Sequence, residues 1–286
     1  MRKSILPLLT VLLLALHGAS PAVAGPPPGG WLELPASAHE AGSTVITTRA
    51  TLGGEDMRSF TYRYDRVGCI ALWVAYPLNR ALIGTGSRGE EWTPDPALPE
   101  SAQPVLYRGF RPGAQRYDRG HQIPSADRLD AAANAQTFRF TNATPQLHGF
   151  NGGIWAELEK LVRRWCYASD TLYVVTGCIP GNDYINDNIG HPVNIPGAYY
   201  KAVLRLHHWK NGAAHYQGCA FLLPHMDIPL DEKTAVEACR PYACSLAALQ
   251  EKTGEVFFPA LEGIVGKGTY RDIVNEDPQG VPWWWR

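Results

Sequence analysis

The residue types between positions 117 and 163 could hydrolyse a phosphodiester bond with one divalent metal ion. His121 ends the run Tyr-Asp-Arg-Gly-His at 117–121, Asn151 follows thirty positions later, and Glu159 and Arg163 lie four residues apart. The reaction needs a base that activates water, charge stabilisation at the phosphoryl oxygens and help for the leaving alkoxide. An imidazole, an arginine and a metal held by an amide oxygen can supply these three functions.

Each of these residues also has an ordinary structural interpretation. A lone His is more often a structural side chain than a base, and Asn151 could cap the helix that begins after it. Glu159 and Arg163 have the spacing of an exposed helix pair worth only about 0.2–0.5 kcal/mol, and Arg119 could belong to a surface turn. The combination, rather than any single residue, favours the catalytic interpretation.

A helix over residues 154–165 would bring several candidates together. At 100° per residue, Asn151, Glu159 and Arg163 fall within an arc of about 120°. One face then carries an amide oxygen, a carboxylate and a cation. Amide and carboxylate oxygens are hard ligands, which suit a Mg²⁺ ion that keeps most of its water.

At these positions the chain resembles the DNA/RNA non-specific endonucleases of the ββα-metal class. The resemblance covers about residues 57–265. It rests on segments whose order and spacing match the family: 118–121, 141–146, Asn151, Trp155, 158–159 and Arg163, flanked by 73–76, Arg88 with 92–96, 172–177 and 195–201.

The resemblance implies a metal-assisted mechanism. His121 would be the general base, Asn151 the only direct protein ligand of Mg²⁺, and Glu159 a holder of metal-bound water. We expect Mn²⁺ to be a possible substitute for Mg²⁺. Asp118 would orient the motif loop rather than touch substrate.

The resemblance also implies the substrates. Arg88, Arg119 and Arg163 would contact the scissile and neighbouring phosphates, because a guanidinium is planar and always charged. DNA and RNA would both be cut with little sequence preference, since groups that grip phosphates read no base edges.

The N-terminus has the pattern of an export signal. Residues 1–24 contain Arg2-Lys3, a mostly apolar run from 5 to 16 and a small-residue cleavage site at 22–24. A retained anchor or a buried helix is the alternative. We expect a Pro/Gly-rich linker at 25–40 and a single domain at 41–286, secreted or periplasmic and without a membrane segment in its mature form.

The charge of the mature chain gives no general attraction for polyanions. Without Arg2 and Lys3 the chain holds 24 basic and 27 acidic residues, a formal charge of −3. A nucleic-acid enzyme with this balance must concentrate its positive charge. The candidates for such a patch are Arg108, Arg111, Arg116, Arg119, Lys160, Arg163 and Arg164.

The six cysteines are an even number, which in an exported chain suggests up to three disulfides. Their connectivity stays open, although Cys239 and Cys244 are close enough in sequence for a small loop. No Cys-x-x-Cys pair is present, so a zinc cluster is not expected.

The remaining pattern predicts an α+β fold. Apolar runs at 70–76, 172–176, 199–206 and 216–223 predict strands of a mixed or antiparallel sheet, and 154–165 and 245–252 predict helices. A hairpin bearing His121 would pack against the helix bearing Asn151. The three Trp at 283–285 could stack on bases or, more ordinarily, cover a core edge.

Two other functions remain open from sequence alone. The fold could be a catalytically dead module that binds nucleic acid or a surface, because fold does not fix function. It could also be a phosphodiesterase for small nucleotide esters. The presence of His121, Asn151, Glu159 and Arg163 together argues against the dead module.

Overall fold

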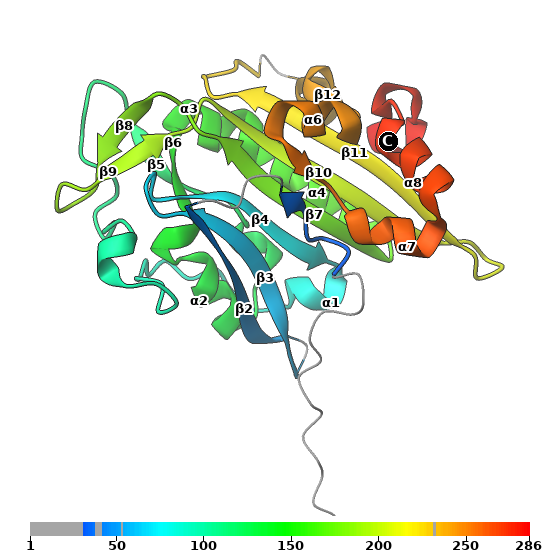
Figure 1. Cartoon of the computed structure of the whole chain (residues 1–286), viewed down its shortest axis with the longest axis horizontal. Coiled ribbons are helices and arrows are strands. Elements are labelled where there is room, and N and C mark those ends of the chain that lie inside the picture. The colour runs from blue at the N-terminus through cyan, green and yellow to red at the C-terminus, as the bar shows by residue number, and fades with distance from the viewer. Residues whose placement is uncertain (1–30, 38–41, 53, 231–232) are drawn as a thin grey trace, which may run out of the picture.

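A seven-stranded antiparallel sheet runs through the protein (Figure 1). The computed structural model describes residues 31–37, 42–52, 54–230 and 233–286, so the predicted signal peptide at 1–24 lies outside the described residues. The strands of the sheet are, in spatial order, β12 (Ala243–Cys244), β11 (Ala214–Pro224), β10 (Ala198–His208), β7 (Thr171–Ile179), β4 (Ile70–Leu78), β3 (Glu55–Asp65) and β2 (Ser43–Leu52).

All four strands predicted from apolar runs are present as β4, β7, β10 and β11. The strands β2 and β3 were not predicted, because their sequences are rich in Thr and Arg and lack a continuous apolar run. The two strands are held by pairing with each other, and the hydroxyls of Thr47 and Thr61 lie 2.9 Å apart across the pair. The register of this pair shifts between Thr48 and Arg49.

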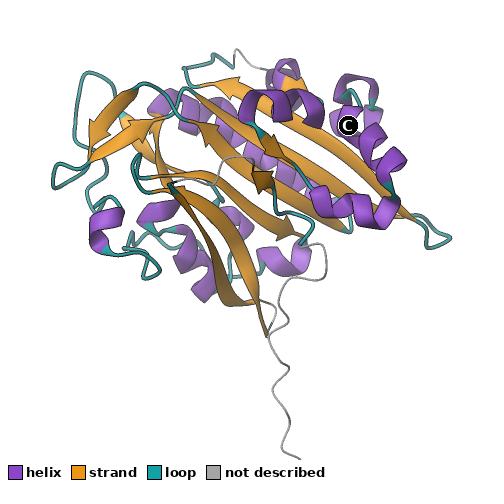
Figure 2. Cartoon of the chain, viewed as in Figure 1, coloured by secondary structure: helices purple, strands orange, loops and turns teal. Residues whose placement is uncertain are grey.

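The sheet is buried on both faces. Strand alternation sends neighbours such as Val174 and Val175 into two separate apolar cores. Helix α4 (Ala156–Tyr167) packs on one face, and α6 (Leu246–Thr253) and α8 (Lys267–Asn275) pack on the other (Figure 2). The predicted helix at 245–252 is confirmed: Ser245 caps it by accepting a hydrogen bond from Ala248 N–H at 3.1 Å, and it ends at Gly254 with φ 73°.

The element that carries the site is a two-stranded ladder leading into a helix. Strand β5 (Tyr117–His121) pairs with β6 (Ala143–Leu147), and β6 runs through α3 (His148–Phe150) and a π-helical turn (Asn151–Trp155) into α4. The two strands are not a tight hairpin, because residues 122–142 lie between them. Gly120 is required in β5, since a Cβ there would lie 2.2 Å from the Gln146 side chain across the ladder.

Shorter elements complete the chain. They are β1 (Ala36–Ser37), α1 (Arg80–Ile83), α2 (Ala131–Thr137), β8 (Asp183–Asn186), β9 (Pro192–Ile195), α5 (Ala235–Cys239), β13 (Glu255–Val256) and α7 (Glu262–Val265), with several 3₁₀ turns between them. Residues 31–37 fall inside the range predicted as linker, but they pack on the domain. Strand β1 pairs with β13, and Glu33 accepts a hydrogen bond from Arg58 Nε at 2.6 Å.

The expected disulfides are not seen. All six cysteines are free thiols, and five of them are buried. The pair close in sequence is separated by the sheet: Cys239 lies in the core on the α4 face, whereas Cys244 packs against the core on the other face. An even count is a compositional signal and does not place two sulfurs side by side.

The three Trp near the C-terminus cover the edge of the core. The Trp284 ring is fully buried, 4.8 Å from that of Trp165 at the end of α4. The Arg205 guanidinium lies 3.9 Å above the Trp283 ring. Within the described residues no helix has the length and apolar character needed to cross a bilayer.

Candidate active site

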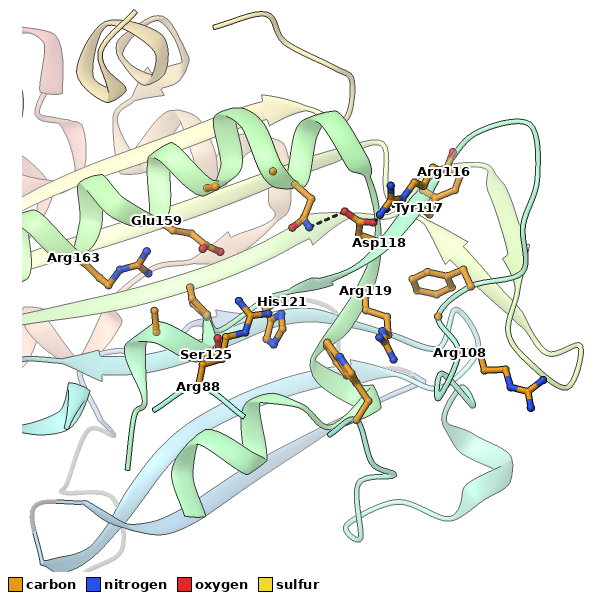
Figure 3. Close-up of a pocket in the computed structure, with 18 residues that line it drawn as sticks. Arg88, Arg108, Arg116, Tyr117, Asp118, Arg119, His121, Ser125, Glu159 and Arg163 are labelled. Carbon is orange, nitrogen blue, oxygen red and sulfur yellow. Dashed lines mark hydrogen bonds and ion pairs between the residues drawn. The ribbon is translucent and has the colours of Figure 1, made fainter. Parts of the chain in front are cut away.

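All six residues predicted for the site line one groove of about 640 Å³ between β5 and α4 (Figure 3). They are Arg88, Arg119, His121, Asn151, Glu159 and Arg163. The ladder supplies two of them and the helical segment three. Positions more than forty residues apart in sequence therefore converge because β6 leads directly from the ladder into the helix.

The His121 imidazole is held between aromatic rings. Its centroid lies 4.8 Å from that of Trp92 and 4.9 Å from that of Phe138. Burial, reinforced by the positive charges of Arg88 and Arg119, lowers the pKa of His121 to about 3. Its Nε2 atom has no hydrogen-bond partner among the described residues. The ring is thus neutral at physiological pH, and its Nε2 atom can accept a hydrogen bond or a proton.

The Asn151 side chain is oriented by Asp118. The amide nitrogen of Asn151 donates to Asp118 Oδ2 at 3.1 Å, and the same carboxylate oxygen lies 2.7 Å from His148 Nδ1. Arg116 lies 3.5 Å from the other oxygen. Because the amide nitrogen is engaged, the amide oxygen remains available as a ligand. Asp118 was predicted to orient the motif loop, and in the structure its carboxylate binds the side chain of Asn151.

The backbone at Asn151 departs from a regular helix. The turn from Asn151 to Trp155 is π-helical, and Gly153 within it has the non-helical angles φ −98° and ψ −117°. Helix α4 proper begins at Ala156, two residues later than predicted. π-helical turns often occur at functional sites. The pair Gly152-Gly153 provides the conformational freedom that this turn requires.

A network of charged side chains surrounds Glu159. Burial raises the pKa of Glu159 to about 7, while the charges of Lys201 and Arg163 oppose the shift. Arg163 Nη1 donates to Asp127 Oδ1 at 3.0 Å, and the hydroxyl of Tyr76 donates to Asp127 Oδ2 at 2.9 Å. The Arg163 guanidinium therefore lines the groove while its Nη1 atom is bound by the buried Asp127 carboxylate.

Two buried residues of this network were missed by the sequence analysis. Lys201 is fully buried, donates to Thr176 Oγ1 at 2.7 Å and lies 4.7 Å above the Trp155 ring. Burial lowers its pKa to about 8. Asp127 is 1% exposed. A charged residue in an apolar strand, as at Lys201, was the available signal. Asp127 lies in a short 3₁₀ turn (Ser125–Asp127) and offered none.

The arginines of the groove differ in how firmly they are held. Arg119 Nη1 donates to the carbonyl oxygens of Leu106 and Tyr107 at 2.8 and 3.1 Å, and its guanidinium lies 4.9 Å above the Trp92 ring. Arg88 lies 5.5 Å above the Phe138 ring and makes no hydrogen bond or ion pair with any described residue. Arg88 is therefore more available to an incoming phosphate than Arg119.

The donor set fits a hydrated hard cation. Within the described residues no group of three or more His, Cys, Asp or Glu side chains could hold a metal. The free amide oxygen of Asn151 and the Glu159 carboxylate line the same groove, and no hydrogen bond from the described residues reaches that carboxylate. This arrangement suits an ion such as Mg²⁺ that keeps several waters.

Comparison with known proteins agrees with this geometry. A family model described as DNA/RNA non-specific endonuclease matches residues 41–263. A nuclease of Nostoc sp. is 33% identical over 155 residues, which are 51% of this chain and 52% of the relative. The mitochondrial nuclease of Saccharomyces cerevisiae is 30% identical over 217 residues, 70% of this chain and 64% of the relative. The chain thus spans about half to two thirds of the length of these relatives.

A solved structure shares the fold. EndoG, in a structure of its complex with EndoGI, superposes with a TM-score of 0.55 at 19% identity over 82% of this chain and 89% of that chain. The α+β fold is therefore that of the ββα-metal nucleases, as predicted. With the family model covering most of the described residues, the chain belongs to the DNA/RNA non-specific endonuclease family.

Proposed function

We propose that the protein is an exported, divalent-metal-dependent endonuclease that hydrolyses DNA and RNA with little sequence preference. The observation that carries the proposal is the placement of a neutral imidazole with a free nitrogen, at His121, in the same arginine-lined groove as Asn151. Family membership supports phosphodiester hydrolysis of nucleic acids by a metal-dependent nuclease.

Each residue has a defined task in this proposal. His121 takes the proton of the attacking water at its free nitrogen. Asn151 would hold the metal through its amide oxygen, and Glu159 would accept hydrogen bonds from water in the groove. The metal, Mg²⁺ or Mn²⁺ as a substitute, would supply positive charge at the leaving oxygen. None of these contacts involves the edge of a base.

The arginines bind the polyanion. Arg88 has no competing partner and takes a phosphate directly, whereas Arg119 and Arg163 present guanidinium groups that are already oriented by the protein. Phosphate binding of this kind displaces condensed counterions, so affinity falls as salt rises. With a formal charge of −3 on the mature chain, the attraction is confined to the groove.

Export rests on the sequence of residues 1–24, which we propose to be removed near Gly25. The relatives do not decide the location, because one is bacterial and another mitochondrial. Mass spectrometry of protein collected from culture medium or periplasm is expected to give a chain that begins at or near Gly25. A chain that retains Arg2 and Lys3 in the exported fraction would contradict the proposal.

Digestion assays test the enzymatic proposal. Purified mature protein should nick and linearise supercoiled plasmid and degrade RNA, lose both activities in EDTA and regain them on addition of Mg²⁺ or Mn²⁺. Undiminished cutting in excess chelator would contradict the metal-dependent mechanism. Hydrolysis of small phosphodiesters without plasmid nicking, and with a flat salt profile, would identify the small-ester phosphodiesterase instead.

A further inference from the structure

The loop of residues 105–111 carries one arginine of the groove and holds another. Arg108, in this loop, lies at the outer rim of the groove, with its side chain exposed (Figure 3). The carbonyl oxygens of Leu106 and Tyr107, in the same loop, accept the two hydrogen bonds from Arg119. Both guanidinium groups therefore depend on the conformation of one loop that has no helix or strand of its own.

This loop is fastened by a side chain far away in sequence. Asn188 lies in the turn between β8 and β9, about 80 residues from the loop. Its Oδ1 accepts a hydrogen bond from Arg108 N–H at 2.9 Å, and its Nδ2 donates to the Gly109 carbonyl oxygen at 2.6 Å. Its backbone N–H also donates to the Val105 carbonyl oxygen at 3.0 Å. One residue thus contacts the loop at three positions.

The turn that presents Asn188 is itself rigid. The fully buried carboxylate of Asp187 accepts hydrogen bonds from the backbone N–H groups of Ile189, Gly190 and His191 at 2.8–2.9 Å. Its other oxygen accepts from Val105 N–H at 2.7 Å. The turn conformation therefore does not depend on the Asn188 side chain. Replacing that side chain should release the middle of the loop, at residues 108–109, while the backbone bonds at Val105 and Arg111 remain.

We infer that Asn188 is a positioning residue for substrate phosphate binding, which acts by fixing loop 105–111 and, through it, Arg108 and Arg119. Asn188 does not line the groove, so it touches no substrate. The inference rests on the proposed function in that the anion gripped by these arginines is a nucleic-acid phosphate. Preorganised guanidinium groups lose less conformational freedom on binding than mobile ones.

A double-mutant cycle tests the inference. Asn188→Ala is combined with Arg108→Ala and, separately, with Arg119→Ala, and the affinity for a fluorescent single-stranded DNA is measured in EDTA, where no cutting occurs. We expect Asn188→Ala alone to weaken binding about tenfold, and to have little or no effect once the arginine it positions has been removed. The background in which the effect disappears identifies that arginine.

Kinetics provide a second readout that general destabilisation would not give. With Mg²⁺ present, Asn188→Ala should raise KM for DNA and RNA and leave kcat within about twofold, because His121 and Asn151 are untouched. The matched control is Ile189→Ala, the next residue in the same turn, whose side chain is 60% exposed. This variant should behave like the wild type in both assays.

The outcomes separate the inference from the proposed function. Equal fold-losses for Asn188→Ala in all three backgrounds, or no loss in the wild-type background, would overturn the positioning role. If Asn188→Ala does not fold, Asn188→Asp enters the same cycle, because it retains an acceptor for Arg108 N–H and replaces the bond to Gly109 with a repulsive contact between a carboxylate oxygen and a carbonyl oxygen. Wild-type protein that binds DNA but never cuts it would refute the nuclease proposal. The double-mutant cycle would still test the role of Asn188, because it measures binding alone.

Discussion

His121 and Glu159 face the same groove from different elements, and their surroundings shift their pKa values in opposite directions. On the β5 side, the imidazole is packed between aromatic rings near two arginines, and its pKa falls to about 3. On the α4 side, the carboxyl group is buried near Lys201 and Arg163, and its pKa rises to about 7. Burial disfavours the charged form in both cases.

The comparison shows how one groove can hold an unprotonated base beside a carboxyl group that titrates near neutrality. The nearby cations add to the effect of burial at His121, whereas at Glu159 they oppose it. Environments that push two titratable groups apart are a general sign of divided acid and base roles. Single-residue variants can break or sharpen this comparison.

The largest effect is expected on the imidazole side. His121→Ala removes the proposed base and should lower the rate of plasmid and RNA cleavage by about 10²–10⁴, while DNA binding in EDTA stays close to that of the wild type. Rates are measured at saturating Mg²⁺. The matched control is His208→Ala, which removes an exposed histidine paired with Asp170 away from the groove and should not change the rate. Folded His121→Ala protein that cuts at the wild-type rate would remove the base assignment.

The second prediction separates the arginines on the two sides. Arg163→Ala leaves the buried Asp127 without its cation and should lower the free energy of unfolding by about 3–5 kcal/mol. Arg88→Ala removes a guanidinium without a partner and should change stability by no more than about 0.5 kcal/mol. Urea unfolding measures both variants. Equal stabilities would show that the Asp127–Arg163 pair is not the structural anchor described here.

Arg88→Ala should instead act on substrate binding. Loss of one phosphate contact is expected to raise KM for DNA and to reduce the slope of log affinity against log salt by about one. Binding titrations at several salt concentrations measure the slope. An unchanged slope would remove Arg88 from the set of phosphate-binding residues.

The third prediction concerns stability against pH in EDTA-treated protein. The folded pKa of Glu159, about 7, lies above the ordinary value of 4.5. The folded state therefore binds more protons between pH 4.5 and 7, and stability falls as pH rises through this range. Glu159→Gln removes this loss. At pH 8 the variant should be more stable than the wild type by up to about 3 kcal/mol, and at pH 4 the two should agree.

The imidazole side should show the opposite slope. The folded pKa of His121, about 3, lies below the ordinary value of 6.5, so the unfolded state binds more protons between these values and stability falls as pH drops. His121→Asn should reduce the loss of stability as pH drops below 6.5. Glu159→Gln should reduce the loss of stability as pH rises towards 7. Thermal melts from pH 4 to 8 measure both, and a single variant that reduced both losses would contradict two independent environments.

The smallest effect on activity is expected at the C-terminal Trp residues, which do not line the groove. Trp283→Ala removes a ring packed 6.1 Å from Trp165 and under the Arg205 guanidinium, so it should destabilise the fold by about 0.5–2 kcal/mol. The rate of DNA cleavage at low temperature should not change. A clear drop in affinity for single-stranded DNA would instead favour the base-stacking interpretation of this tail.

Much of the site could be predicted from sequence because its chemistry depends on residue types at short spacings. The run 117–121 and the residues Asn151, Glu159 and Arg163 were sufficient to identify the groove, and Arg88 also lines it. The four apolar runs predicted four strands of the sheet. The strands β2 and β3 could not be predicted, since their stability comes from cross-strand pairing rather than from an apolar pattern.

The sequence by itself determined which chemical groups are present, which segments form apolar strands and helices, and which family the chain resembles. Only the tertiary structure decided the environment of each group: the aromatic clamp on His121, the Asp118 contact that orients Asn151, the anchoring of Arg163 by Asp127 and the separation of Cys239 from Cys244 by the sheet. The physical reason is that local propensity and periodicity act over a few residues, whereas burial, pKa and hydrogen-bond partners arise from contacts between segments tens of residues apart.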